Sequence, residues 1–202
     1  MGLNKIKVNM EKLIKEDLLD IIEYEKDRTN YRKNIILYKK NRRIALGPNV
    51  TMVFENKKTL TFQIQEIMRA ERLVHESQIQ NEIDVYSSIM PPDNGLSATL
   101  FLEVTEEKKI RPILDSFIGL SYGENIFFQI GDERIPAIFE SGREKEDNIS
   151  SVHYIKFNFN EEHKTKFMDL NIKVNLVINF KDYNHSIEIM NKTRDSLQND
   201  LK

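Results

Sequence analysis

The segment Pro91-Pro92-Asp93-Asn94-Gly95 divides the sequence into two parts that differ in hydrophobic pattern. Such a run ends regular structure, because proline lacks an N–H donor and glycine and asparagine tolerate turn conformations. Before the segment, most apolar residues recur at helical spacing; after it, they alternate with polar residues along short runs, as in half-buried strands. This order predicts an α+β fold, with a helical N-terminal half packed on a mostly antiparallel sheet of five or six strands.

The length of 202 residues suits one domain. We expect a single domain over 1–202, in which 1–90 is mainly helical with a short β-hairpin and 96–202 forms the sheet portion. The hairpin should place strands on both sides of Gly47-Pro48-Asn49, which is a turn sequence.

The helices of the N-terminal half are predicted from spacing and from capping residues. Residues 11–43 show a helical pattern in which Thr29-Asn30 suggests a break and a restart. The stretch 57–75 alternates at its start like a strand but also fits one helix face, and we favour a helix from about residue 58. Ser77 with Gln80 forms a capping-box pattern, so another helix is expected to begin there.

Composition excludes several kinds of function. The chain has no cysteine, so it has no thiolate nucleophile and no iron–sulfur ligand of its own. Its 30 basic and 32 acidic residues argue against a dedicated nucleic-acid binder, although segment 26–43 is strongly basic. Neither a signal-peptide pattern nor an apolar run of about 18 residues occurs, so no membrane span is expected and a cytoplasmic location is predicted.

Polar residues on predicted apolar faces are the first candidates for a site. On a helix through Leu60, Ile64, Ile67 and Val74, Glu71 falls about 20° from Leu60, inside the apolar stripe, and His75 lies one turn further on. His153 alternates in register with apolar residues of one strand, and His185 does so in another. Carboxylate and imidazole groups suit Fe, Zn or Mn, so Glu66, Glu71, His153 and His185 are candidate ligands of a divalent transition metal. The alternative is a set of structural ion pairs with Arg69 and Arg72.

Three stretches resemble a family catalogued as domain of unknown function 3501. They are residues 42–56, residues 63–72 with the pattern Q-x-Q-E-x-x-R-x-E-R, and residues 151–157. The resemblance implies no established activity. It implies partners, namely a rubrerythrin-like di-iron protein and a Cys-rich iron–sulfur oxidoreductase, in oxidative stress defence or electron transfer. His75 lies outside the family pattern.

The resemblance also implies a candidate polar network near His153, with Glu55 and Asn56 of the preceding strand as further members. Its members are Gln63, Glu66, Arg69, Glu71, Arg72 and His153. Arginine side chains in such a network can bind an anionic ligand bidentately, or they can form ion pairs with the two glutamates.

Three functional hypotheses remain from the sequence. The favoured one is a non-catalytic accessory protein of a rubrerythrin and iron–sulfur oxidoreductase system. A metal-dependent enzyme with a Glu/His site is the first alternative. The second is an RNA-binding module that uses segment 26–43.

Overall fold

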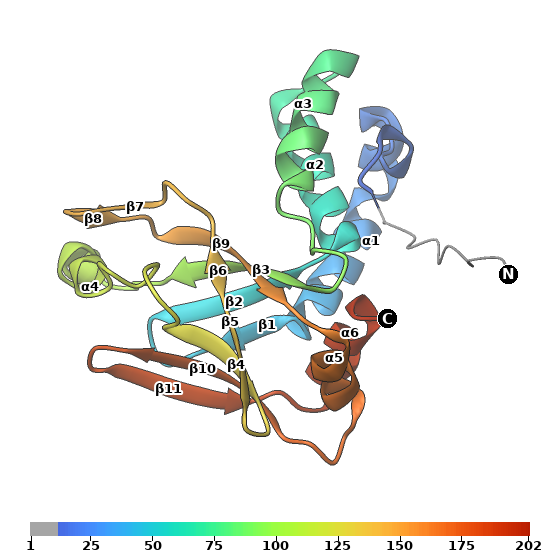
Figure 1. Ribbon diagram of the computed structural model, residues 1–202. Helices are drawn as coiled ribbons and strands as arrows, with labels where there is room; N and C mark the ends of the chain where they lie inside the picture. The colour runs from blue at the N-terminus through green and yellow to red at the C-terminus, as the bar shows by residue number, and fades with distance from the viewer. Residues whose placement is uncertain (1–11) are drawn as a thin grey trace, which may run out of the picture.

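The computed structural model describes residues 12–202 and places the helices around two antiparallel sheets (Figure 1). A single-turn helix η1 (Lys15–Asp17) precedes the long helix α1 (Ile21–Lys40). The Asp20 side chain begins α1, because it accepts hydrogen bonds from the first free N–H groups of the helix. The predicted break at Thr29-Asn30 is wrong. The Asn30 amide instead donates to the Asp27 carboxylate, 3.0 Å away and one turn back, so it caps no new helix.

The predicted hairpin and the following helix are confirmed. Strands β1 (Arg43–Ala45) and β2 (Val50–Glu55) pair in antiparallel register, and α2 (Lys57–Glu71) follows. Asn56 decides between helix and strand here, because its side chain accepts from the Thr59 N–H and Thr59 Oγ1 accepts from the Asn56 N–H. The helix ends at Glu71 because Arg72 adopts a left-handed conformation, with φ of 54°.

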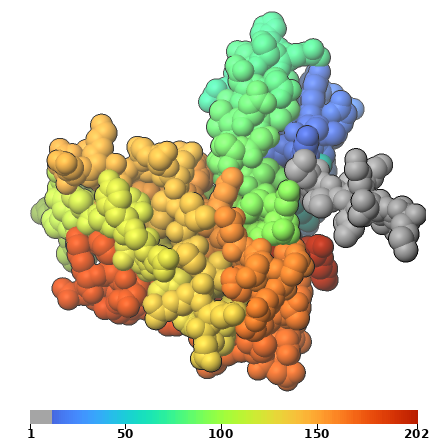
Figure 2. All heavy atoms as spheres, viewed as in Figure 1, coloured from blue at the N-terminus to red at the C-terminus, as the bar shows by residue number. Residues whose placement is uncertain are grey.

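Helix α3 (Glu76–Ser87) pairs with α2 in an arm that rises above the sheets (Figures 1 and 2). The arm has a core of its own, to which Ile64 and Met68 of α2 and Ile79 and Ile83 of α3 contribute. The predicted capping box is wrong, since α3 begins before Ser77 and the Gln80 amide donates to Asp84.

The first sheet has five strands, a number within the predicted five or six, in the order β1-β2-β3-β9-β6. Its further strands are β3 (Gly95–Leu102), β9 (Val152–Asn158) and β6 (Ile138–Phe139). The hairpin before the 91–95 segment therefore shares one sheet with strands from the second part of the chain. All its pairings are antiparallel.

A second sheet, in the order β11-β10-β4-β5, adds to this arrangement. Its strands are β4 (Ile126–Ile130), β5 (Glu133–Pro136), β10 (Val174–Phe180) and β11 (Tyr183–Glu188). A small hairpin of β7 (Glu144–Lys145) and β8 (Asn148–Ile149) stands apart. The remaining elements are η2 (Glu107–Lys109), α4 (Ile110–Ser116), α5 (Glu161–Met168) and α6 (Asn191–Asp200).

The main core brings together side chains of both sheets. Phe54 and Phe157 of the first sheet contact Phe128 of the second, with ring centroids 5.8 and 4.7 Å from it. The other face of the first sheet is turned toward α1 and α2, and this face carries the candidate site. In the described residues 12–202, the helices are too short or too polar to cross a membrane.

Candidate functional site

Glu66 joins α2 to α1 through a complete set of hydrogen bonds. The Arg28 guanidinium donates to both carboxylate oxygens over 2.8 Å, and the Tyr24 hydroxyl donates to Oε1 over 2.6 Å. These bonds, with those from Arg28 contributing most, lower the pKa of Glu66 to about 2 although burial opposes the change. Burial and the bond to Glu66 raise the pKa of Tyr24. Glu66 is thus a fully paired carboxylate at a helix–helix contact.

Two other residues of the 63–72 motif also hold neighbouring segments in place. Arg69 donates to both oxygens of Glu25 on α1, over 2.6 and 3.2 Å. The buried Gln65 amide exchanges two hydrogen bonds of 2.9 Å with the backbone of Leu19, as a paired strand would. The motif therefore codes for helix packing to a large extent.

Glu71 and Arg72 are exposed, and so is His75, which contradicts the predicted burial of the Glu71–His75 pair. The prediction placed Val74 on the apolar stripe of the helix, but α2 ends at Glu71 and Val74 is 67% exposed. Glu71 lies on the same side of α2 as the buried Leu60, Ile64 and Met68, but it is the last residue of the helix and is exposed there.

His153 is buried as predicted, but it faces the core between the sheets. Its Nε2 lies 2.8 Å from the Ser150 carbonyl oxygen, and its Nδ1 has no hydrogen-bond partner within residues 12–202. Burial lowers the pKa of His153. Because Tyr154 follows it in the strand, His153 points to the face opposite α2, and it does not join Gln63, Glu66 or Arg69 in a network.

His185 lies in the second sheet, half-buried against the Tyr183 ring at a centroid distance of 4.5 Å. Glu66, Glu71, His153 and His185 therefore have separate surroundings. Across residues 12–202 the structure contains no group of three or more His, Cys, Asp or Glu side chains placed to hold a metal ion. The convergence that the metal-dependent alternative requires is not formed.

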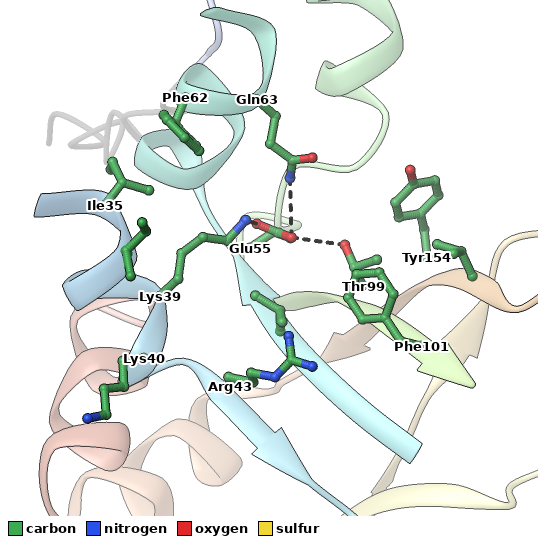
Figure 3. A pocket seen from close by; sticks show the side chains of 13 residues that line it. Ile35, Lys39, Lys40, Arg43, Glu55, Phe62, Gln63, Thr99, Phe101 and Tyr154 are labelled. Atoms are coloured by element: carbon green, nitrogen blue, oxygen red, sulfur yellow. Dashed lines mark hydrogen bonds and ion pairs between the residues drawn. The ribbon is translucent and has the colours of Figure 1, made fainter. Parts of the chain in front are cut away.

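A hollow of about 510 Å³ lies between α1, α2 and the outer face of the first sheet (Figure 3). Such a volume suits a small organic molecule. Its walls are mostly apolar, and the strand register places Val53, Thr99 and Tyr154 side by side across its floor. The helix side adds Ile35 and Phe62, which face Phe101 and Tyr154 across the opening in Figure 3.

Glu55 reaches this hollow from the end of β2 and is only 1% exposed. Its Oε1 accepts from Thr99 Oγ1 over 2.9 Å and from the Gln63 amide over 3.4 Å. Its Oε2 has no hydrogen-bond donor among residues 12–202, and the Lys39 ammonium lies 3.7 Å away, beyond hydrogen-bonding distance. A buried carboxylate normally has every oxygen paired, so this one is incomplete.

Three basic side chains line the hollow together with Glu55. Lys39, Lys40 and Arg43 all line the hollow, and Arg43 also forms an ion pair with Glu103. Figure 3 shows the amine of Lys39 beside Glu55, whereas the amine of Lys40 points away from it. The polar centre of the hollow is therefore one carboxylate beside one ammonium group, enclosed by apolar walls.

Sequence reasoning identified Gln63 and named Glu55 as an extension of the network, but it missed Lys39, Thr99 and Tyr154 as parts of one site. Val53, Phe101 and Val152 are apolar residues on the outward-facing side of their strands. Outward apolar residues indicate that a second layer covers the sheet. That signal was present in the sequence.

Two comparisons with known proteins found a match, and both matches are to proteins of unknown function. A family model described as "Protein of unknown function (DUF3501)" matches residues 12–201. A crystal structure of a novel protein of unknown function from Burkholderia pseudomallei is 26% identical, with a TM-score of 0.86. The match covers 95% of this chain and all of that one. The comparison with curated proteins found no match.

Proposed function

We propose that this chain, which belongs to the DUF3501 family of proteins of unknown function, is a non-catalytic binding protein for a small, largely apolar molecule. The observation that carries the proposal is the buried Glu55 carboxylate, which leaves one oxygen without a hydrogen bond inside an apolar hollow. Leaving a buried polar group unpaired is unfavourable, and a ligand that supplies a donor removes that cost. Two fixed donors on Oε1 hold the carboxylate in orientation before a ligand arrives.

The test is a fluorescence titration with N-phenyl-1-naphthylamine, an uncharged dye that emits strongly in apolar surroundings. The wild-type protein should bind it saturably. Val152→Trp places a large ring on the wall of the hollow and should weaken binding at least about tenfold.

The matched control is Ile187→Trp, an equivalent change of a partly exposed residue in the second sheet, outside the hollow. It should bind the dye as the wild type does. Equal binding by all three proteins, or no binding by the wild type, would contradict the proposal.

A second proposal concerns a protein partner, and it is favoured by an exposed face of α1 whose last residues, Ile36 and Lys40, also line the hollow. Lys26, Lys33 and Lys40 follow one another at seven-residue intervals, so they lie on one side of the helix. They form no ion pair with any residue of 12–202. Ile22 and Ile36 accompany them and are 71% and 57% exposed. A face of this kind suits an acidic partner with an apolar centre.

The family resemblance supplies candidates for that partner, a rubrerythrin-like di-iron protein and a Cys-rich iron–sulfur oxidoreductase. In this proposal the partners carry the redox centres, since the chain has no cysteine. Immobilised wild-type protein should retain one of them, and Lys33→Glu should reduce retention. Lys145→Glu, an exposed change on β7, is the control. Failure of the wild type to retain either partner would count against this second proposal.

A further inference from the structure

The polar centre of the hollow presents opposite charges side by side. Glu55 Oε2 and Lys39 Nζ are 3.7 Å apart, close enough to attract but too far for a hydrogen bond. Lys39 comes from α1 and Glu55 from the end of β2, so two different elements bring the pair together. Each group keeps hydrogen-bonding capacity for a third molecule.

A ligand with a single charge would suit only one of these groups. An ammonium ion bound to Glu55 would lie beside the Lys39 ammonium, and a carboxylate bound to Lys39 would lie beside Glu55. In both cases like charges would meet in a partly desolvated space, where repulsion is stronger than in water. A ligand that carries both charges on neighbouring atoms avoids this, because each of its groups faces the opposite charge.

The walls of the hollow indicate the size and polarity of the rest of the ligand. Phe62 and Ile35 lie on one side of the charged pair, and Phe101 and Tyr154 lie on the other (Figure 3). The volume of about 510 Å³ leaves room for a large side chain beyond the charged groups. Aromatic and aliphatic walls favour an apolar side chain, since its transfer from water drives binding.

Resting on the proposed function, we infer that the ligand is a zwitterionic amino acid with a large apolar side chain, or a compound with the same end group. Its ammonium group donates to Glu55 Oε2, and its carboxylate accepts from Lys39 Nζ. Thr99 and Gln63 keep the Glu55 carboxylate turned toward the ligand through Oε1. The apolar side chain lies between the two walls.

Three probes with the same ring separate these contributions: L-tryptophan, tryptamine, which lacks the carboxylate, and indole-3-propionate, which lacks the ammonium. The protein contains no tryptophan, so indole emission reports on the probe alone. Emission shift and anisotropy are measured against protein concentration. L-tryptophan should bind at least about tenfold more tightly than either analogue, since each analogue loses one charge-assisted hydrogen bond.

Two variants assign the charged groups. Glu55→Gln should weaken L-tryptophan and tryptamine at least about tenfold and should not weaken indole-3-propionate. Lys39→Met should weaken L-tryptophan and indole-3-propionate and should not weaken tryptamine. Glu66→Gln, a change of the paired carboxylate, is the matched control and should leave all three affinities unchanged. Circular dichroism and dye binding show that each variant is folded.

The outcomes distinguish the ligand class from the proposed function. If the naphthylamine dye binds in the hollow but L-tryptophan binds no better than its analogues, or not at all, the amino-acid inference is wrong and the proposed function stands. If Val152→Trp fails to block the dye, the proposed function is wrong. A variant that weakens all three probes equally would also overturn the assignment of the two charges.

Discussion

Glu55 and Glu66 lie eleven residues apart, and both contribute carboxylates to contacts of α1 with its neighbours, yet their surroundings are opposite. Glu66 accepts three hydrogen bonds from Tyr24 and Arg28. Glu55 is more deeply buried, and one of its oxygens accepts no hydrogen bond although Lys39 lies 3.7 Å away. The comparison teaches that a polar motif does not identify a site by itself. The carboxylate whose partners are complete joins two helices, and the incomplete one is the group that we propose for ligand binding.

The largest loss of stability should come from removing a hydrogen-bond partner of Glu66. Arg28→Ala leaves the half-buried Glu66 with only the Tyr24 hydroxyl, so the free energy of unfolding should fall by about 2–3 kcal/mol. Urea unfolding followed by circular dichroism measures it. Lys33→Ala, an exposed change on the same helix, should stay within about 0.5 kcal/mol of the wild type. An equal, small loss in both variants would mean that the Glu66 cluster is not structural.

Acid should remove the same stabilisation from the wild type. The folded-state pKa of Glu66 is about 2, below its ordinary value of 4.5. Because folding lowers this pKa, the ionised Glu66 contributes its full stabilisation above pH 4.5. This contribution is lost as the pH falls toward 2. After allowance for solvent screening, the loss should be about 2 kcal/mol. The free energy of unfolding of Glu66→Gln should not show this decrease between pH 4.5 and 2. An identical pH dependence in the wild type and in Glu66→Gln would contradict the prediction.

The second clamp of α1 and α2 should be weaker. Arg69 and Glu25 form the same forked contact, but their side chains are 37% and 52% exposed. A double-mutant cycle with Arg69→Ala and Glu25→Ala should give a coupling free energy clearly smaller than the effect of Arg28→Ala, because water screens this exposed pair. A value as large as the effect at Arg28 would show that burial does not separate the two clamps.

The smallest effect on stability is expected at the most buried of these carboxylates. Glu55→Gln loses the attraction of Lys39 but also removes a desolvated charge, and the amide oxygen can still accept from Thr99. The free energy of unfolding without ligand should change by no more than about 0.5 kcal/mol. A loss of about 2 kcal/mol or more in urea unfolding would mean that Glu55 and Lys39 form a structural ion pair.

The local patterns in the sequence predicted much of the fold. Alternation located most of the strands, and the turn at Gly47-Pro48-Asn49 located the hairpin. What the patterns could not show is which strands share a sheet, because pairing depends on contacts far apart in the chain. The sequence patterns therefore did not predict the second sheet, and they did not predict that β6 joins the first sheet.

The candidate site was predicted only in part, and for a related reason. His153 was correctly placed on a buried face, but burial alone did not say which side of the sheet faces α2. Glu71 was misplaced because the left-handed Arg72 ends the helix before Val74, and no glycine marks this end. Glu55 was recognised only as an accessory to the motif, since its burial depends on α1 and α2 covering the outer face of the sheet.

The central claim, that Glu55 serves a ligand whereas Glu66 serves the fold, is tested most directly by the melting temperature with and without saturating L-tryptophan. A ligand raises the melting temperature only of a protein that binds it. The account predicts that Glu66→Gln melts lower than the wild type but rises by the same amount with the ligand. Glu55→Gln should melt near the wild type and show little or no rise. An equal rise in both variants would contradict the account.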